Sequence, residues 1–141
     1  KIDLIADYFQ NIVKLEDNPK IACITHQGHH DLKFMPFSLT NAPTTYQNLM
    51  NLIFQEQMRK HILVFFNDIL VYSPTLELHV KHVIEVLNIL RQHQLYAKMS
   101  KCSFAQLQVE YLGHIISAER VQADLKKVEC MERWPKPKNV K

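Results

Sequence analysis

The strongest pattern in the chain lies in residues 61–73, HILVFFNDILVYS, where β-branched, aromatic and other apolar residues dominate. Such a composition is typical of buried strands. Two polar residues, Asn67 and Asp68, interrupt the run at its centre. A buried strand offers an amide and a carboxylate no partners, whereas a hairpin turn accepts both. The pattern therefore predicts two strands joined by a turn around Phe66, Asn67 and Asp68.

Shorter patterns predict strands elsewhere in the chain. Residues 17–19, Asp-Asn-Pro, form a turn signal. Gly28 can adopt a positive φ, so it suits a turn between two strands through residues 27–29. The strands expected outside the central hairpin cover residues 2–4, 12–15, 21–25, 32–35, 96–99 and 109–116.

Three segments carry the apolar spacing of amphipathic helices. The first is expected to begin where Thr40 or Asn41 accepts from the free amides, with Pro43 in the first turn, and to run to about residue 57. The second begins at Thr75, and the third covers residues 124–134. The buried stripes are expected at Tyr46, Leu49, Met50, Ile53 and Phe54 in the first helix and at Val80, Val83, Val86, Leu87 and Leu90 in the second.

The order of these elements indicates the fold class. Strands come first, and helices then alternate with hairpins, without the regular strand–helix–strand repeat of a parallel sheet. We predict an α+β fold in which helices back one face of an antiparallel sheet. The 141 residues suffice for one domain with a buried core, and 47 % apolar with 22 % charged residues indicates a folded protein rather than a disordered one.

The composition argues against a membrane protein, a disulfide-bonded protein and a structural metal site. The longest purely apolar run, residues 62–66, is far shorter than the roughly 18 residues that span a bilayer, so no membrane partner is expected. The three cysteines form neither a metal-binding pair nor a disulfide framework and indicate reduced thiols in an intracellular protein. The pairs His29 with His30 and His79 with His82 lack a fourth ligand at a fixed spacing, so we expect no structural metal there.

Charge is unevenly distributed along the chain. Residues 1–70 carry six basic against seven acidic side chains, a net charge of −1, whereas residues 71–141 carry eleven against seven, a net charge of +4. An acidic half that holds cations beside a basic half that meets phosphates favours a nucleic-acid partner. A solvated surface with chance asymmetry explains the same numbers equally well.

The polar turn at Asn67 and Asp68 has two interpretations. Both residue types are common in hairpin turns for purely local reasons. Another carboxylate in apolar company, Asp3, lies on the strand expected at residues 2–4. If the two strands are neighbours, Asp3 and Asp68 meet and would repel unless a divalent cation lies between them. A pair of Mg²⁺ ions roughly 3.5–4 Å apart is the usual means of promoting in-line attack on a phosphate.

Five sequence motifs favour the interpretation of Asp3 and Asp68 as a metal-binding pair. In chain order they are K-I-D-L…Y, M-P-F-x-L-T-N-A-P-x-x-Y/F-Q, V-F-F-x-D-I-L-V-Y-S, L-Y-A-K-x-S-K-C-x-F and Y-L-G-H-I-I-S. With this set the chain resembles the reverse transcriptase of gypsy-type LTR retrotransposons over essentially all 141 residues. One motif alone would be weak, but five in order with natural spacing are strong. The resemblance implies a polymerase palm over residues 1–117 and the start of the thumb or connection segment over residues 118–141.

The resemblance assigns a catalytic metal site to three residues. Asp3 matches one metal-binding aspartate, Phe65 the aromatic residue before the acidic pair of the hairpin, and Asp68 the second acid of that pair. The first acid, the more direct ligand, falls on Asn67. An amide has the shape of a carboxylate but gives Mg²⁺ only a neutral, weaker oxygen. The resemblance therefore implies two Mg²⁺ ions bound more weakly than in active relatives, with a loss of several orders of magnitude in rate.

Further positions carry roles by the same resemblance. Tyr8 matches the aromatic residue under the incoming sugar, and Phe37 with Ser38 matches a nucleotide-contacting Phe-Gly turn. Lys101 matches a lysine that protonates the departing pyrophosphate as a general acid, or it is a solvated surface lysine. The expected primer grip consists of Leu112, Gly113 and His114.

Several positions depart from the family pattern. The chain reads Ile5, Ala6 and Asp7 where the family usually has Arg-Ser-Gly, and Phe9 where it has His. An arginine missing near the triphosphate would weaken nucleotide binding. Together with Asn67, these changes are typical of a decayed element copy.

We therefore expect the palm of an RNA-directed DNA polymerase, a nucleotidyltransferase from a retrotransposon Pol polyprotein, impaired by Asn67. Its expected partners are an RNA or DNA template with primer, deoxynucleoside triphosphates, and the fingers, thumb and RNase H segments of the same polyprotein, in the cytoplasm or in a virus-like particle. The fingers are expected to precede Lys1. The alternative is a non-catalytic remnant that binds nucleic acid or protein, or a copy without function.

Overall fold

The computed structural model describes residues 1–5 and 7–135. The chain forms two compact units, Lys1–Phe104 and Ala105–Lys141. Ala6 lies outside the described residues. The expected boundary after residue 117 stays a prediction, because the division into units follows contacts rather than polymerase subdomains.

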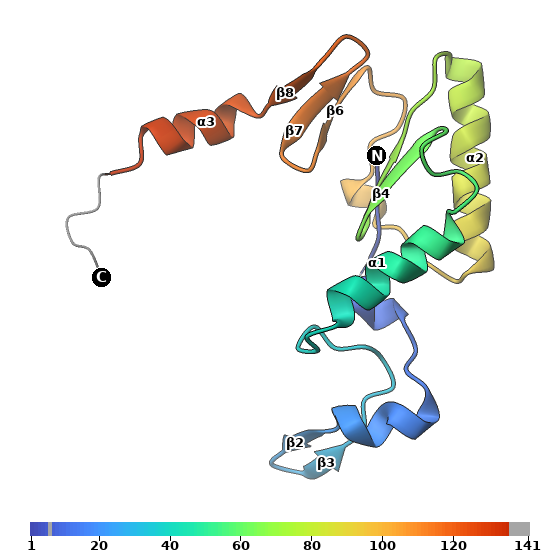
Figure 1. Cartoon of the computed structure of the whole chain (residues 1–141), viewed down its shortest axis with the longest axis vertical. Coiled ribbons are helices and arrows are strands. Elements are labelled where there is room, and N and C mark those ends of the chain that lie inside the picture. Colours follow the sequence, from blue (N-terminus) through green and yellow to red (C-terminus); the bar gives the residue numbers. More distant parts are fainter. Residues whose placement is uncertain (6, 136–141) are drawn as a thin grey trace. The chain divides into compact units, whose positions relative to one another are not determined.

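The first unit is built on a three-stranded antiparallel sheet (Figure 1). It contains β1 (Ile2–Asp3), β4 (Ile62–Phe65) and β5 (Asp68–Val71), in the order β1-β5-β4. The hairpin predicted from the central apolar run is confirmed. Its turn consists of Phe66 and Asn67 alone, since Phe65 pairs with Asp68.

Strand alternation divides this sheet into two chemically different faces. Ile2 and Val64 both lie opposite Ile69 and belong to the buried core on one face. Asp3 and Phe65 both lie opposite Asp68, and successive side chains point to opposite faces, so these residues share the other face. The apolar face thus holds the fold together and leaves the carboxylates on the opposite side.

Helix α1 (Ala42–Ile53) contacts β4 and supplies much of the core. Tyr46, Met50 and Phe54 are fully buried, as the apolar stripe predicted. Asn41 stands at the N-cap, but its side chain accepts no capping hydrogen bond because its backbone is helical (φ −92°, ψ −2°) rather than extended. The capping bond expected from Thr40 or Asn41 is therefore wrong, and so is the continuation to residue 57.

Helix α2 (Leu76–Gln92) contacts β5. The helix begins at the predicted position, and Thr75 caps it with an extended backbone and a hydroxyl that accepts from the Leu78 N–H at 3.3 Å. Val86 and Leu90 are buried, whereas Val80 and Leu87 are 50 % and 40 % exposed. The predicted stripe was too wide, because this small sheet covers only a narrow strip of the helix.

The first 35 residues differ most from expectation. A short 3₁₀ helix covers Asp7–Gln10 and another covers Leu15–Ile21, with Pro19 inside it. The strand predicted at 12–15 is reduced to a single bridge between Ile12 and Phe34. Gly28 has the predicted positive φ of 117°, but β2 (Cys23–Thr25) pairs with β3 (Gly28–His30) rather than with residues 32–35. The 3₁₀ helix over Leu15–Ile21 and the short hairpin that follows it occupy the residues that longer strands would need.

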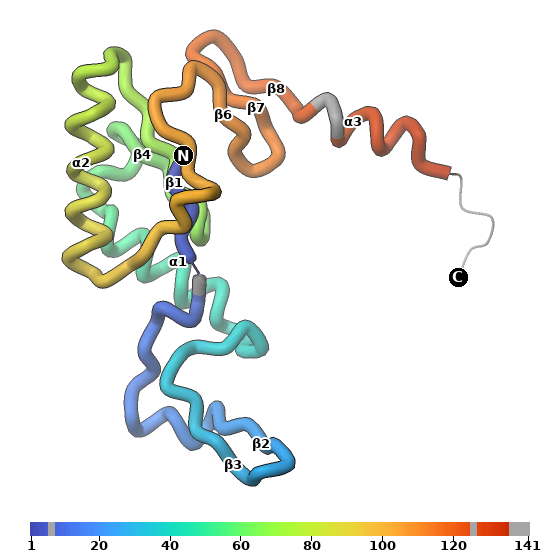
Figure 2. Tube along the Cα trace, turned by 180° about the vertical axis from the view of Figure 1, so that it is seen from behind, coloured from blue at the N-terminus to red at the C-terminus, as the bar shows by residue number. Residues whose placement is uncertain are grey.

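The strand predicted at 96–99 is also reduced to one bridge, between Leu4 and Ala97. Backbone bonds still tie this segment to β1: the Ile5 N–H donates to Tyr96 O at 2.8 Å and the Lys98 N–H to Asp3 O at 2.7 Å. A 3₁₀ turn, Met99–Lys101, follows directly. Segments nearly one hundred residues apart in sequence therefore lie side by side, as the trace in Figure 2 also shows.

The second unit contains a three-stranded antiparallel sheet and one helix. Strands β6 (Gln108–Tyr111) and β7 (His114–Ser117) form the hairpin predicted at 109–116, and β8 (Val121–Ala123) was not predicted. Helix α3 (Leu125–Glu132) lies inside the predicted range 124–134. Of the helices in the described part of the chain, none is both long and apolar enough to cross a membrane. The α+β class is confirmed, with three small antiparallel sheets in place of one.

Candidate active site

Asp3 and Asp68 lie directly opposite each other on adjacent strands. The main-chain pairing of β1 with β5 sets this register, since Ile2 opposite Ile69 aligns the apolar face and the next pair must then be the two aspartates. Directly opposite residues on one face have Cβ atoms roughly 4.5–5.5 Å apart. The structure thus brings together the two carboxylates that the sequence predicted as partners.

Asp3 is nearly removed from solvent, with 7 % of its surface exposed. Its Oδ1 is buried and accepts no hydrogen bond from the described residues. The ammonium of Lys101 lies 3.7 Å from this oxygen, too far for a hydrogen bond but close enough for an ion pair. A buried anionic oxygen without a hydrogen bond is costly on its own, so this position suits a cation.

Asp68 is paired with a residue that sequence reasoning missed. The Lys1 Nζ lies 2.9 Å from Asp68 Oδ1, and both side chains are about one fifth exposed, at 21 % and 19 %. Strand alternation could have predicted this ion pair. Lys1 and Asp3 are two residues apart, so their side chains lie on the same face of the sheet as Asp68. Lys1 and Lys101 together balance the charge of the two aspartates in this structure.

Asn67 occupies the second position of the turn and is half-buried. Its carbonyl accepts from the Leu4 N–H at 3.0 Å, so the residue that follows β1 also holds the turn. The described residues contain no group of three or more His, Cys, Asp or Glu side chains able to hold a metal ion. The two opposed carboxylates suit a divalent cation, and with Asn67 as their neighbour in sequence the chain offers one anionic ligand fewer than the family pattern.

Phe66, the first residue of the turn, has a positive φ of 48°. Its N–H donates to the Oε1 of Gln47 in α1 at 2.7 Å. Sequence reasoning gave Gln47 no role, although it ends one of the five motifs. No local signal links the two residues, since 19 positions separate them.

The residues expected to contact the nucleotide form an aromatic group. Tyr8 is half-buried, and its ring makes edge contacts with Phe37 at 4.9 Å and with Tyr46 at 5.4 Å between centroids. Phe9 also contacts Phe37, at 5.1 Å. Phe37 and Ser38 are themselves exposed. Their roles toward a nucleotide stay predictions.

The expected primer grip lies in the second unit. Leu112 and Gly113 form the two-residue turn between β6 and β7, with φ of 51° and 77°. Two consecutive residues with positive φ are typical of a tight hairpin turn, and glycine adopts this geometry without strain. Leu112 and His114 are exposed. Their contact with a primer stays a prediction.

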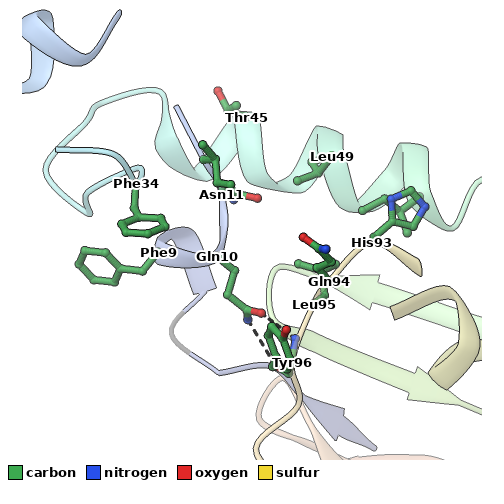
Figure 3. A pocket seen from close by; sticks show the side chains of 12 residues that line it. Phe9, Gln10, Asn11, Phe34, Thr45, Leu49, His93, Gln94, Leu95 and Tyr96 are labelled. Atoms are coloured by element: carbon green, nitrogen blue, oxygen red, sulfur yellow. Dashed lines mark hydrogen bonds between the residues drawn. The ribbon is translucent and has the colours of Figure 1, made fainter. Parts of the chain in front are cut away.

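A cavity of about 600 Å³ in the first unit lies elsewhere. Figure 3 shows it lined by residues of the first 3₁₀ helix, of α1 and of the segment after α2, with Phe9 and Tyr96 among them. The Gln10 amide joins two of these segments, because it accepts from the Tyr96 N–H at 2.6 Å and donates to Tyr96 O at 3.3 Å. None of the predicted site residues lines this cavity.

A histidine cluster lies where α2 meets the start of β4. The rings of His61 and His82 stack at 4.0 Å, and His61 Nε2 lies 3.3 Å from Glu85 Oε2. Ser73 Oγ lies 2.7 Å from His82 Nδ1 and 3.5 Å from His79 Nδ1. Burial, with the neighbouring His82, lowers the pKa of His61 below its ordinary value, although Glu85 acts in the opposite direction.

Comparison with known protein families gives a single assignment. Residues 1–116 match the model of the family described as reverse transcriptase (RNA-dependent DNA polymerase). Among curated proteins, the chain is 35 % identical over 140 residues to a retrovirus-related Pol polyprotein from transposon opus of Drosophila melanogaster. It is 32 % identical over 141 residues to the transposon Tf2-3 polyprotein of Schizosaccharomyces pombe. The chain spans only 14 % and 11 % of the length of these two relatives.

Solved structures give the same fold. A foamy viral protease-reverse transcriptase in complex with an RNA/DNA hybrid aligns with a TM-score of 0.86 at 18 % identity, over 96 % of this chain and 18 % of that one. The same protein in a dRH form with double-stranded DNA aligns with a TM-score of 0.88 at 18 % identity, over 96 % of this chain and 24 % of that one.

Proposed function

The chain belongs to the reverse transcriptase family, and we propose that it forms the palm of a retrotransposon RNA-directed DNA polymerase. The observation that carries this proposal is the direct opposition of Asp3 and Asp68 across β1 and β5. The proposed reaction is nucleotidyl transfer, in which a primer 3′-hydroxyl attacks the α-phosphate of a deoxynucleoside triphosphate. The relatives that the chain matches are Pol polyproteins, which makes a larger polyprotein its proposed context.

Asp3, Asp68 and the amide oxygen of Asn67 would hold divalent ions, two Mg²⁺ by the family pattern. Bound there, such ions would activate the attacking hydroxyl and stabilise the charge that develops on the transferred phosphate. The buried Oδ1 of Asp3, which accepts no hydrogen bond from the described residues, supports this placement.

Lys101 is suited to a second role in the same site. Its ammonium stands 3.7 Å from Asp3 Oδ1, while its side chain remains 55 % exposed. A half-exposed ammonium beside the carboxylates can turn toward a departing pyrophosphate and donate a proton to it. Tyr8, supported edge-on by Tyr46, would lie under the incoming sugar and exclude a 2′-hydroxyl.

Template and primer are the proposed nucleic-acid partners. Foamy viral structures with this fold contain an RNA/DNA hybrid or double-stranded DNA. The excess of basic residues after residue 70 would contact mainly phosphate and sugar, with little sequence preference.

A non-catalytic remnant is the second candidate, and Asn67 favours it. The missing carboxylate removes charge where catalysis rests on charge neutralisation. Lys1 and Lys101 already form ion pairs with Asp68 and Asp3, which a metal ion would have to replace. Such a module would keep the fold and bind nucleic acid or protein without chemistry.

Primer extension on an RNA template with Mg²⁺ separates the two candidates. The polypeptide carries the fingers segment of a relative ahead of Lys1 and is compared unaltered, as Asn67→Asp, and as Asn67→Asp with Asp3→Ala. We expect extension only from Asn67→Asp, several orders of magnitude above the other two. Equal extension by the unaltered protein would refute our account of the metal site. Extension by none of the three would favour the remnant.

A further inference from the structure

The turn that carries Asn67 has an unusual backbone for its sequence. Its first residue, Phe66, has a positive φ of 48°. That position in a two-residue hairpin turn is normally taken by glycine, asparagine or aspartate, because a larger side chain is strained at positive φ. The fold therefore has to hold Phe66 in place, or the turn would relax and move the side chains of Asn67 and Asp68.

The side-chain amide of Gln47 makes the bonds that hold it. Its Oε1 accepts from the Phe66 N–H at 2.7 Å, and its Nε2 donates to the Val64 carbonyl at 3.3 Å. Strand β4 lies at the edge of its sheet, and Val64 and Phe66 are two residues apart, so these two groups point away from β5 on the same side. One side-chain amide thus replaces the peptide group that a further strand would have offered.

Gln47 is itself fixed in orientation. Its Nε2 also donates to Asn51 Oδ1 at 2.8 Å, one helical turn further along α1. The neighbouring Tyr46 and Met50 are fully buried, so this part of α1 is anchored in the core. The bond to Phe66 therefore connects the turn to a rigid element rather than to a mobile side chain.

The turn is also held by the residue that follows β1. The Leu4 N–H donates to the Asn67 carbonyl at 3.0 Å, one residue after Asp3. Phe66 is thus bound to α1 and Asn67 to Leu4, the residue after β1. These two attachments set where Asn67 and Asp68 stand relative to Asp3, because only the two turn residues separate β4 from Asp68.

We propose that Gln47 is a positioning residue of the carboxylate site: it imposes the strained turn at Phe66 and thereby keeps Asn67 and Asp68 in register with Asp3 for a divalent ion. The proposal rests on the proposed function, since it concerns the ion-binding geometry of the same site. Gln47 acts through the backbone of the turn and does not itself bind the ion.

The test combines amide hydrogen exchange with a Mn²⁺ titration followed by paramagnetic line broadening, on the 141-residue chain with Asn67→Asp. Gln47→Met removes both hydrogen-bonding groups at similar length, and Gln47→Glu keeps the acceptor for Phe66. The matched control is Gln92→Met, at the exposed end of α2.

We expect Gln47→Met to lower the protection of the Phe66 amide about tenfold while the ladder amides of β5 keep theirs. Its Mn²⁺ affinity should fall about three- to tenfold, and Gln47→Glu should restore the protection of Phe66 and most of the affinity. Gln92→Met should change neither. An equal loss of protection at all amides would overturn the proposal, because it would indicate general destabilisation.

The positioning role of Gln47 and the metal site can be refuted separately. If the Asn67→Asp chain with intact Gln47 binds Mn²⁺ and Gln47→Met binds it equally well, the positioning role of Gln47 is refuted and the proposed metal site stands. If the Asn67→Asp chain with intact Gln47 does not bind Mn²⁺, the metal site itself is refuted, and the role of Gln47 toward it is refuted with it.

Discussion

Two hairpins of the first unit have the same strand pairing but differ in their burial and in the contacts that hold their turns. Both β2–β3 and β4–β5 are antiparallel pairs joined by a two-residue turn. The first forms a sheet of its own with both strands largely exposed, and the bonds at its turn come from Thr25, within the hairpin. The second has β1 at its side, α1 and α2 on its apolar face, and a turn held by Gln47 and Leu4.

The difference teaches how to interpret polar residues at a hairpin turn. In β2–β3 the local explanation suffices, since Gly28 supplies the positive φ and Thr25 the hydrogen bonds. In β4–β5 the residue with positive φ is a phenylalanine, and distant residues hold it. Backbone strain maintained by tertiary contacts is typical of functional sites.

The largest difference between the hairpins is expected in metal binding. In the Asn67→Asp protein, Asp3→Asn should lower Mn²⁺ affinity and primer extension by at least about a hundredfold, because it removes an anionic ligand from a site that stabilises developing charge. Asp31→Asn, the same exchange in an exposed residue after β3, should change neither. Both are measured by Mn²⁺ titration and by extension assay. Equal effects of the two substitutions would contradict the assignment.

Packing should separate the hairpins next. Ile69→Ala in β5 removes a side chain with 0 % exposure and should lower the free energy of unfolding by about 2–5 kcal/mol. Ile24→Ala in β2, at 75 % exposure, should change it by less than about 0.5 kcal/mol. Urea denaturation followed by circular dichroism measures both. A large loss from Ile24→Ala would show that β2–β3 packs against something.

The independence of the exposed hairpin can be tested at its glycine. Gly28→Ala meets no atom within 4 Å of the added Cβ, so its cost comes from the φ of 117° alone, about 1–2 kcal/mol. Because β2–β3 makes its own small sheet, we expect faster amide exchange confined to residues 23–30 and an unchanged urea midpoint. A lowered midpoint would mean that the hairpin unfolds together with the core.

The smallest effect is expected from pH. The pKa of His61, just before β4, is lowered in the folded protein chiefly by burial, with His82 and Lys60 acting in the same direction and Glu85 against them. The unfolded chain therefore binds a proton first, so the stabilising contribution is complete above the ordinary histidine pKa of about 6.5 and is lost as the pH falls through the folded pKa.

Urea midpoints at pH 8 and pH 5.5 measure this dependence. His61→Gln should reduce the difference between the two pH values, whereas His29→Gln, at an exposed position in β3, should leave it as it is. An unchanged difference in His61→Gln would exclude His61 as its source.

The elements with strong periodicity were predictable from the sequence. The central hairpin, the start of α2 at Thr75 and the core positions Tyr46, Met50, Val86 and Leu90 follow from patterns within a few residues. The strands predicted at 12–15, 32–35 and 96–99 were wrong. Each of these segments forms only a single bridge, and the partner residue lies far away in the chain. Their apolar residues resemble strands locally, but too little sheet is present to extend the pairing.

The candidate site likewise has features that the sequence predicts and features that only the structure reveals. The sequence by itself determined that a carboxylate lies in each of two apolar strands, that an amide replaces the neighbouring acid, and that the motifs belong to one family in order. Only the tertiary structure decided that Asp3 faces Asp68, that Lys1 and Lys101 pair with them, and that Gln47 holds the turn. The physical reason is range: periodicity and turn chemistry act within a few residues, whereas register, ion pairs and edge hydrogen bonds join residues that meet only when the chain has folded.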